Sequence, residues 1–405
     1  MIITCRSCNG TVREFVDFGS IPLVNAFTNN EKISGRKFPL RLMICDKCKL
    51  CQIDEIPNPD LIYRDYKHIS SGSVDNLNHI RDTALKLKNV IKLDNNAIVL
   101  EVGCNDGSLL QQLNGLGMRT IGIDPAKNLS HYHKEKKVEV ISDHLDDASI
   151  KEVLRLYPEG VDAIVGLNVF AHFESVPSIF KKLNNVLKDN GSFYLEVAYA
   201  LETIYSSNYD TVYHEHVFNW SAISIQKALN QAGFYVESMS QINTQGGSLS
   251  VLAKKGNSKI DDNKLISKEV SMGLTDNSYY ENASKKIIEK IKAINESIHK
   301  FIEIDEPCLL LGAPARGVVT VNTSILNMYN NLNFIDDTPE KKDTYFPGTN
   351  HKVLNWDSIR NFSDIPKKAI LLSWNYKDTI IEKAKQAGFQ GEILQFSPEI
   401  QITTT

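Results

Sequence analysis

Two pairs of cysteines near the start of this 405-residue chain have the spacing of a metal site. Two residues separate Cys5 from Cys8, and two separate Cys45 from Cys48. A turn of that length lets both sulfurs of a pair face one ion, and two such turns complete a tetrahedron. We therefore predict a structural Zn²⁺ held by all four thiolates, with no open coordination position. The alternative is a set of free thiols, and we expect the surplus Cys51 to pack rather than to ligate.

A second group with chemical potential is the run Tyr213-His214-Glu215-His216, the densest ionisable cluster of the sequence. A histidine there can act as a general base near neutral pH, and a neighbouring glutamate can orient it. In an extended loop Tyr213 and Glu215 would point one way and the two histidines the other, whereas a turn would break this alternation. A surface loop without a catalytic role is an equal alternative, and the HExxH spacing of a helix-borne zinc site is missing.

A glycine-containing turn follows an apolar stretch in VLEVGCNDGSLLQQL, residues 99–113. The glycines let the backbone approach a ligand where a strand ends, and the next helix offers free N–H groups and a positive dipole. The segment is not GxGxxG, which disfavours a dinucleotide. The next expected strand ends in Asp124, where an acid can accept hydrogen bonds from ribose hydroxyls, although it could also merely end the strand.

The turn and the strand-end acid together resemble the Rossmann-like methyltransferases that bind S-adenosylmethionine. A further expected strand ends in Asn168, which can touch the amino acid portion of the cofactor because strand ends line the crevice of such a sheet. We expect His172 to start a helix, where it could face a ligand or bond locally. The resemblance assigns these residues to the cofactor: Glu101, Gly103, Asn105, Asp106, Asp124 and Asn168.

The elements that must position these residues follow an α/β pattern. Between residues 97 and 255, the apolar runs AIVLEVG, RTIGID, DAIVGLN and GSFYLEVAY alternate with amphipathic stretches, which predicts a parallel sheet with helices on both faces. A polar stretch over residues 256–269 is a candidate linker, and a helix is expected over about 279–304. Beyond it, the strands PCLLLGA, LNFIDD, KAILLSW and GEILQF and the helices RGVVTVNTSIL and DTIIEKAKQAGF indicate a second α/β unit.

Composition excludes several classes of protein. Hydrophobic residues make up 42% of the chain and the net charge is −4, which provides no basic footprint for duplex nucleic acid. No run reaches the roughly 18 apolar residues that span a bilayer, and the start does not have the pattern of a signal peptide. We therefore expect a cytoplasmic protein with no nucleic-acid or membrane partner.

Several segments match one family, the sugar C-methyltransferases of deoxysugar biosynthesis. They include CRSC with CDKC, DFGSIPLVNAF, SSGSVDN, EVGCNDGSLL, GLNVFAHF, YHEHVFNWS, GGSLSV, GAPARG, FIDDTPEKKDTYFPGT and LLSWNY, and they run from residue 5 to about 376. The resemblance implies a zinc-binding N-terminal domain over residues 1–85 and a Rossmann-like methyltransferase domain over 86–256. It also implies a C-terminal α/β domain over 257–405 that helps to bind a sugar nucleotide, and it favours a monomer.

The activity implied by the resemblance is methylation of C3 in a nucleotide-linked 4-keto-6-deoxy sugar. His216 matches the family's base, which removes the C3 proton to form an enolate that attacks the methyl group of S-adenosylmethionine. Tyr213 and Glu215 match its helpers, and Asn168 and His172 match family site positions.

The chain departs from the family pattern near the sugar. Its Tyr66-Lys67-His68 segment has His68 where the family has a second tyrosine, and Gln245 replaces a histidine before Gly-Gly-Ser. Arg316 stands in place of a lysine and can pair with phosphate through two hydrogen bonds, a surface role being equally open. The substrate-binding assignment is therefore Tyr66, Gln245 and Arg316, with His68 among the catalytic candidates.

Three other functions compete with this hypothesis. An O- or N-methyltransferase on a related sugar nucleotide would use the same cofactor site without a ketone. A nucleic-acid methyltransferase would need a basic stripe that is not evident. A non-catalytic cofactor-binding protein would have no use for the Tyr213-Glu215-His216 cluster.

Overall fold

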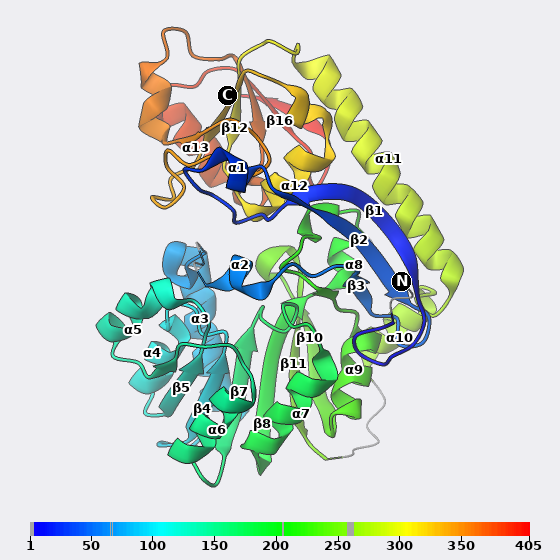
Figure 1. Ribbon diagram of the computed structural model, residues 1–405, viewed down its shortest axis with the longest axis vertical. Helices are drawn as coiled ribbons and strands as arrows, with labels where there is room; N and C mark the ends of the chain where they lie inside the picture. Colours follow the sequence, from blue (N-terminus) through cyan, green and yellow to red (C-terminus); the bar gives the residue numbers. More distant parts are fainter. Residues whose placement is uncertain (1–3, 65, 67, 205, 257–262) are drawn as a thin grey trace. The chain divides into compact units, whose positions relative to one another are not determined.

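The computed structural model describes residues 4–64, 66, 68–204, 206–256 and 263–405, and the chain divides into two compact units (Figure 1). The first unit contains Met1–Glu14, Met43–Glu202 and His216–Tyr279. The second contains Phe15–Leu42, Thr203–Glu215 and Tyr280–Thr405. Each unit is built around its own sheet, so we describe them separately.

The first unit is built on a seven-stranded sheet in the order β10-β11-β8-β7-β4-β5-β6. Strands β4 to β8 pair in parallel, whereas β11 runs antiparallel to both β8 and β10. The apolar runs form its centre because these strands are covered on both faces and contain few exposed positions. The strands are β4 (Ile98–Val102), β5 (Arg119–Ile123), β6 (Val140–Ile141), β7 (Val161–Leu167), β8 (Leu187–Ala198), β10 (Phe234–Ile242) and β11 (Ser248–Lys255).

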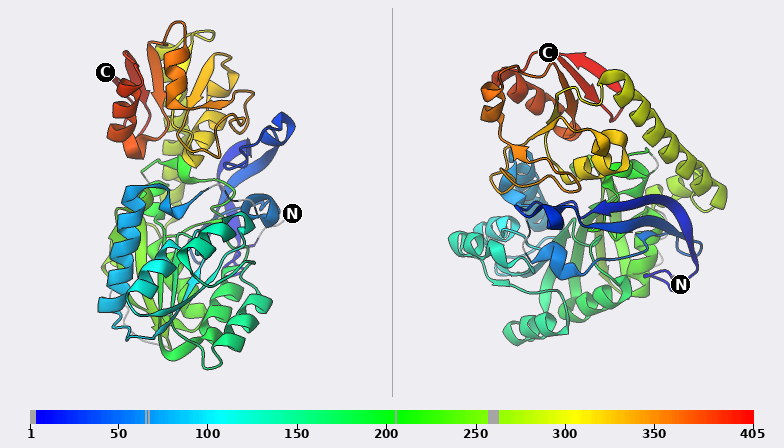
Figure 2. Two further views of the ribbon diagram at one scale, coloured as in Figure 1. Left: turned by 90° about the vertical axis from the view of Figure 1, so that its left-hand side faces the viewer. Right: turned by 45° about the horizontal axis from the view of Figure 1, so that its top comes forward.

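Helices cover this sheet on both faces (Figures 1 and 2). Helix α7 buries Val176, Ile179, Phe180, Leu183 and Val186, which lie on one face because their spacing follows the helical period. The opposite face is packed by α3 and α4, which share one hydrophobic cluster with β4, β7, β8 and β11. The helices are α3 (Val74–Val90), α4 (Ser108–Gly115), α5 (Ser130–Lys136), α6 (Asp147–Leu156), α7 (Val176–Val186), α9 (Ala222–Gln231) and α10 (Lys264–Ser271).

A small sheet has the order β1-β2-β3-β9; its first three strands precede β4 in the chain, whereas β9 lies between β8 and β10. The chain passes from the first unit into the second along β1 and returns along β2, and β3 pairs antiparallel with β9 inside the first unit. The strands are β1 (Val12–Pro22), β2 (Lys37–Cys45), β3 (Cys51–Ile53) and β9 (Phe218–Asn219), and the short helices are α1 (Glu31–Ser34), α2 (Pro59–Tyr63) and α8 (Ala200–Thr203).

The second unit has a six-stranded sheet in the order β14-β13-β12-β15-β16-β17. All neighbours are parallel except β17, which runs antiparallel to β16. One core cluster joins β12, β13, β15 and β16 to α13. The elements are α11 (Asn277–Phe301), β12 (Cys308–Leu311), α12 (Ala315–Thr323), β13 (Leu332–Ile335), β14 (Val353–Leu354), β15 (Lys368–Leu371), α13 (Lys377–Gln386), β16 (Glu392–Gln395) and β17 (Gln401–Thr404).

The predicted α/β class is confirmed: a mostly parallel sheet covered by helices in the first unit, and a second α/β sheet built from the C-terminal part of the chain. The predicted linker over 256–269 was partly wrong, because α10 begins at Lys264 and its Glu269 is buried against the start of α9. Residues 257–262 of that linker lie outside the described part. In the two large sheets, the strands β6, β10, β11, β14 and β17 had no prediction. The antiparallel pairing of β11 with β8 and β10 also differs from the expected parallel sheet.

Candidate functional site

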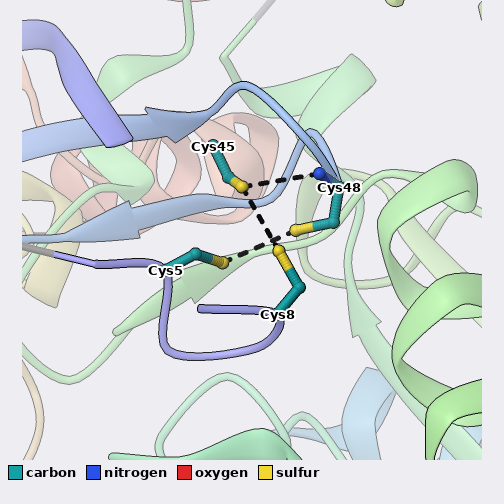
Figure 3. A group of neighbouring side chains, drawn as sticks. All are labelled: Cys5, Cys8, Cys45 and Cys48. Atoms are coloured by element: carbon teal, nitrogen blue, oxygen red, sulfur yellow. Dashed lines mark hydrogen bonds between the residues drawn. The ribbon is translucent and has the colours of Figure 1, made fainter. Parts of the chain in front are cut away.

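The four predicted cysteine ligands meet in one cluster of the first unit (Figure 3). Their sulfur atoms all lie within 4.8 Å of one another, and the contacts Cys5–Cys48 and Cys8–Cys45 are both 3.5 Å. A tetrahedral Zn²⁺ with bonds of about 2.3 Å needs sulfurs about 3.8 Å apart, so the donor set fits the ion. Cys51 lies in β3 and is not among the clustered cysteines of the described residues.

The surroundings of the cluster favour a closed metal site. A Cβ atom on Gly10 would lie 3.1 Å from the side chain of Lys47 and 3.2 Å from the sulfurs of Cys45 and Cys8, so the backbone passes close to the thiols. Backbone N–H groups of Ser7 and Cys48 lie 3.4 Å from cluster sulfurs. Such donors favour thiolates, and four thiolates leave no position for a substrate, so the chemistry supplied here is structural.

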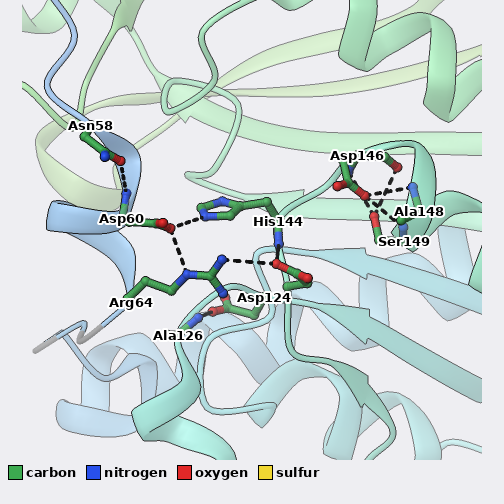
Figure 4. Close-up of polar contacts among 10 residues, drawn as sticks. Asn58, Asp60, Arg64, Asp124, Ala126, His144, Asp146, Ala148 and Ser149 are labelled. Atoms are coloured by element: carbon green, nitrogen blue, oxygen red, sulfur yellow. Dashed lines mark hydrogen bonds and ion pairs between the residues drawn. The ribbon is translucent and has the colours of Figure 1, made fainter.

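The turn after β4 has the backbone that its sequence predicts. Gly103 has a φ of +68°, and a Cβ atom there would lie 2.6 Å from Val169. Asn105 has a φ of 49°. Its N–H donates to Asp124 Oδ2 at 2.8 Å. Figure 4 shows the other bond of this acid, in which Asp124 Oδ1 accepts from Ala126 N at 2.9 Å. Burial raises the pKa of Asp124 despite these two bonds.

Glu101 and Asp106 are both buried beside this turn but differ in their partners. Burial, followed by the charges of Asp106 and Asp124, raises the pKa of Glu101 well above its usual value. Its Oε2 has no hydrogen-bond partner among the described residues, so it is an acceptor that a ligand amine or hydroxyl can satisfy. Asp106 instead accepts from Ser71 N at 3.1 Å and Ser108 N at 3.2 Å and pairs with Lys136 at 3.0 Å.

The described residues between 58 and 72, which we call the strap, are tied across the carboxyl ends of β4 and β5. Asn105 accepts from Ser70 N at 2.8 Å and donates to the carbonyl of His68 at 3.1 Å. Asn128 makes two bonds with the backbone of Tyr66, at 3.1 and 2.9 Å. The strap therefore shares its anchors with the predicted cofactor turn.

The other end of the strap is fixed by charges (Figure 4). Asp60 bonds His144 Nε2 at 3.0 Å and Arg64 at 2.7 Å, and Arg64 reaches Asp143 at 3.4 Å. These side chains are about one-third to one-half exposed, so each pair contributes little by itself. Together they align α2 with the loop after β6.

A row of rings brings several predicted site residues together in the first unit. His172 stacks on His216 with centroids 5.4 Å apart and on Tyr63 at 5.7 Å. Tyr63 lies 5.9 Å from Tyr66, which lies 6.2 Å from His68. Tyr63 was missed by the sequence reasoning, although the aromatic spacing in IYRDYKH was an available signal.

His172 is the desolvated centre of this row. Burial, with the charges of His216 and His68, lowers its pKa to about 3, so it is neutral near pH 7. Its Nε2 is shielded from solvent and has no partner within the described part of the chain. The prediction that His172 starts a helix was wrong, because α7 begins only at Val176.

Asn168 occupies the turn directly after β7, as expected for a residue at the carboxyl edge of the sheet. It has a φ of 56°, and its N–H donates to the carbonyl of Glu196 at 2.8 Å. This bond joins the end of β7 to β8 and fixes the turn at the edge where a ligand of such a sheet would bind.

The remaining predicted site residues lie in the second unit or outside the described side chains. Glu215 Oε1 accepts from Asn25 Nδ2 at 2.7 Å. Burial and the charge of Glu215 raise the pKa of Tyr213, while Arg316 acts in the opposite direction. The unit boundary falls directly after Glu215, and a turn over residues 214–215 replaces an extended alternation. The side chain of Gln245 lies outside the described part, and its backbone is in the short helix Thr244–Gly246.

Three family models match consecutive parts of the chain. Residues 5–63 match a model described as "Putative zinc binding domain", residues 77–239 a "Methyltransferase domain", and residues 243–396 a "C-methyltransferase C-terminal domain". These ranges follow the order of the predicted domains, whose boundaries stay a prediction.

Individual relatives match different shares of the chain. The C-methyltransferase NovU of Streptomyces niveus is 25% identical over 391 residues, which cover 94% of this chain and 92% of that protein. The human mitochondrial ubiquinone biosynthesis O-methyltransferase is 25% identical over 155 residues, covering 35% of this chain and 42% of that protein. The match to the solved magnesium protoporphyrin IX methyltransferase of Synechocystis PCC 6803 covers 45% of this chain and 84% of that chain, with a TM-score of 0.36 and 16% identity.

Proposed function

From the premise that this chain belongs to the S-adenosylmethionine-dependent C-methyltransferases with a zinc-binding N-terminal region, we propose that it methylates C3 of a nucleotide-linked 4-keto-6-deoxy sugar. The match to a C-methyltransferase over 94% of the chain supports transfer to carbon. The observation that carries the proposal is the stack of His216 on a desolvated, neutral His172, in the loop whose Val169 lies against Gly103 of the turn after β4.

In this proposal His216 is the general base. A hydrogen on C3 becomes acidic because the adjacent C4 ketone takes up the electron pair when the proton leaves. Neutral His172 lies against the His216 ring, so it adds no competing positive charge at neutral pH. A positioned base of this kind contributes about 10²- to 10⁴-fold to the rate.

Tyr213 and Glu215, which precede the base in the sequence, are its proposed helpers. Glu215 is held by Asn25 at 2.7 Å, which fixes a carboxylate directly before the base in the chain. The raised pKa of Tyr213 keeps its phenol protonated, so it can donate a hydrogen bond to the enolate oxygen. The enolate carbon would then take the methyl group that a bound cofactor supplies, with the electron pair of the carbon–sulfur bond left on sulfur.

The first unit would hold the cofactor at the turn after β4. When bound, S-adenosylmethionine supplies an electrophilic methyl group. Gly103 would let the backbone approach it, Asp124 would accept hydrogen bonds from the ribose hydroxyls, and Glu101 offers an acceptor oxygen with no partner among the described residues. Alignment of the methyl group with C3 supplies much of the acceleration through proximity.

Three side chains are candidates for the sugar nucleotide. Arg316 is the candidate for the diphosphate, because its planar guanidinium can make two parallel hydrogen bonds. Tyr66 and His68 belong to the ring row and are candidates for the sugar.

No helix of the described residues is long and apolar enough to cross a membrane. That the protein is a monomer stays a prediction.

One experiment tests this function. The purified protein is incubated with labelled S-adenosylmethionine and 4-keto-6-deoxy sugars linked to different nucleotides, and any new methyl group is located by mass spectrometry and NMR. We expect a methyl group on C3 for at least one donor, and His216→Asn to lower kcat by about 10²-fold or more while the cofactor Kd stays within about twofold. His131→Asn, which changes an exposed histidine of α5, is the matched control.

The O-methyltransferase alternative is separated by solvent exchange. Similarity to an O-methyltransferase over 35% of the chain favours it, but that match leaves out most of the chain. Carbon transfer requires His216-dependent exchange of the C3 hydrogen with deuterium oxide in the presence of S-adenosylhomocysteine, whereas oxygen transfer does not. Methyl transfer to oxygen without such exchange would refute the proposal.

A further inference from the structure

The sheet of the second unit has a topological switch point between β12 and β15. From β12 the chain continues to β13 and β14 on one side of the sheet, and it returns to β15 and β16 on the other. Ligands of open parallel sheets bind at the carboxyl ends of the strands beside such a point. Here these ends are followed by the segment Gly312–Arg316 and by the segment Leu372–Trp374.

The two segments touch, and Arg316 of the first forms a cation–π pair with Trp374 of the second. Gly312 has a φ of +88°, and a Cβ atom there would collide with Ser373 Oγ, so only glycine allows this approach. The guanidinium carbon of Arg316 lies 5.2 Å from the centroid of the Trp374 ring. At this distance the cation is attracted to the ring face, and a planar guanidinium can stack on it.

Trp374 is itself fixed by a buried carboxylate. Its indole N–H donates to Asp210 Oδ2 at 2.9 Å, and Asp210 is only 6% exposed. A hydrogen bond to a charged acceptor is stronger than one between neutral groups, so it holds the ring orientation. Asp210 Oδ1 has no hydrogen-bond partner among the described residues and lies at a small cavity lined also by Trp374 and Thr320, with room for roughly one water molecule.

We propose that Trp374, oriented by Asp210, is a positioning residue that presents the guanidinium plane of Arg316 to the diphosphate of the sugar nucleotide. This inference rests on the proposed function, since it assigns the organisation of its nucleotide subsite. Two parallel hydrogen bonds to phosphate require a fixed guanidinium plane, which a long and flexible side chain does not keep alone. The Trp374 ring gives the guanidinium a flat surface to stack on, and the hydrogen bond from the indole N–H to Asp210 keeps that ring in place.

A second role for Arg316 has to be separated from this one. Arg316 is close enough to Tyr213 to oppose the rise in the pKa of that phenol, and Glu215 contributes to the same rise. If Arg316 acted only as a counter-ion for these groups, its loss would change the pH dependence of kcat and leave nucleotide binding unaltered. The test therefore measures binding of the nucleotide alone.

The experiment measures the Kd of UDP, dTDP, GDP and CDP by titration calorimetry on the full chain. For the diphosphate that binds best, we expect Trp374→Leu to raise the Kd about three- to tenfold and Arg316→Ala to raise it at least about tenfold. Trp374→Phe keeps a ring but loses the donor to Asp210, so it should have a smaller effect. In all these variants the Kd of S-adenosylmethionine should stay within about twofold of the wild-type value. The control Arg360→Ala removes an exposed arginine of the same unit and should change neither the diphosphate Kd nor the S-adenosylmethionine Kd.

The decisive comparison is a double-mutant cycle. Because Trp374 acts through Arg316, Trp374→Leu should change the Kd less than about twofold in the Arg316→Ala background. An effect of equal size in both backgrounds, or wild-type protein that binds none of the four diphosphates, would overturn the inference. The methyl-transfer assay on wild-type protein reports separately on the proposed function: C3 methylation with an additive cycle would remove only the role of Trp374.

Discussion

Asp106 is the acid whose replacement best tests how the cofactor turn is built. Its side chain is fully buried, and Oδ2 accepts from Ser71 N and pairs with Lys136, while Oδ1 accepts from Ser108 N. Burial raises the pKa of Asp106, but the hydrogen bonds from Ser71, Lys136 and Ser108 outweigh it, so the pKa lies below its usual value. These partners indicate that Asp106 positions the turn and the strap rather than the ligand.

The cost of Asp106→Asn can be worked out from these contacts. The amide keeps one acceptor oxygen, so one backbone N–H faces an NH₂ group, which costs about 1–3 kcal/mol. Lys136 also loses its counter-ion, and its side chain is only 15% exposed. Breaking a fully buried pair costs about 3–5 kcal/mol, and we discount this to about 2 kcal/mol because Lys136 keeps some solvent contact and its hydrogen bond to the Asp106 carbonyl. With about 1 kcal/mol for the mispaired N–H, the sum is about 3 kcal/mol. A loss of about 3 kcal/mol lowers the melting temperature by about 6–12 °C for a unit of this size.

The assay combines unfolding with cofactor binding. We expect Asp106→Asn to lower the free energy of unfolding by about 3 kcal/mol and to raise the Kd of S-adenosylmethionine at least about tenfold, because the turn and the strap lose a shared anchor. Adding Lys136→Met removes the uncompensated charge and should restore about 2 kcal/mol and part of the affinity. Since the contribution of a carboxylate with a lowered pKa is complete well above its unfolded pKa of about 4, the stability difference should be constant between about pH 6 and 8.

A different pattern would refute this reasoning. If Asp106 contacted the cofactor directly, Asp106→Asn would lower the affinity while the free energy of unfolding changed by less than about 0.5 kcal/mol. Lys136→Met would then restore no affinity. Lys134→Met, on the same helix, is the matched control for the loss of a lysine, because Lys134 is exposed.

Three further predictions follow from desolvated groups of the first unit. Metal analysis should find one Zn²⁺ per chain. Replacing one ligand (Cys48→Ser) or adding a strong chelator should make residues 5–50 susceptible to proteolysis, and an unchanged cleavage pattern would exclude a structural ion. Below about pH 6.5 an unfolded histidine binds a proton, whereas folded His172, with a pKa of about 3, does not, so the folded state loses stability as the pH falls. Between about pH 7.5 and 5, the free energy of unfolding should therefore fall by about 1–2 kcal/mol more in the wild type than in His172→Gln. Equal losses in urea unfolding would contradict this. Glu269→Ala leaves Ala222 N and Ile223 N without an acceptor and should cost about 2 kcal/mol in the same assay, with Glu269→Gln costing less.

Short-range patterns in the sequence predicted the features that depend on residues a few positions apart. The two cysteine pairs and the turn after β4 are of this kind, because each is specified by residue types at short spacing. The place of Asp124 directly after β5 could be predicted because acids recur at the end of the second strand of such sheets, whereas its contact with a ribose stays a prediction. The ionisable cluster at residues 213–216 was identified with a turn left open as an alternative to an extended loop, but the contact of Glu215 with Asn25 was not predicted.

The missed features depend on contacts between distant residues. Asn25 and Glu215 are 190 positions apart, and the strap reaches Asn105 from 35 positions away. No periodicity or motif records such pairs. The segment 256–269 was interpreted as a linker because it is polar, yet its Glu269 is buried where two N–H groups at the start of α9 need an acceptor. A polar residue can thus be a core residue when backbone donors are its partners.

In each unit, an aspartate after one parallel strand accepts a backbone N–H from the turn after the neighbouring strand, which links β4 to β5 and β12 to β13. In the first unit, Asp124 after β5 accepts from the N–H of Asn105 in the turn after β4, at 2.8 Å. In the second, Asp336 after β13 accepts from Ala313 N in the turn after β12, at 2.7 Å, and its other oxygen accepts from Thr338 N. Each acid therefore fixes the loop that a ligand would approach, in addition to any contact with that ligand.

This shared arrangement changes how acids near a strand end are to be interpreted. A carboxylate whose oxygens already accept backbone N–H groups, as in Asp106 and Asp336, has its first role in positioning. Glu101 differs, because its buried Oε2 has no partner within the described residues and burial of an unpartnered acceptor is costly. A bound donor would remove that cost, so among these acids Glu101 is the one whose energetics favour direct contact with the ligand.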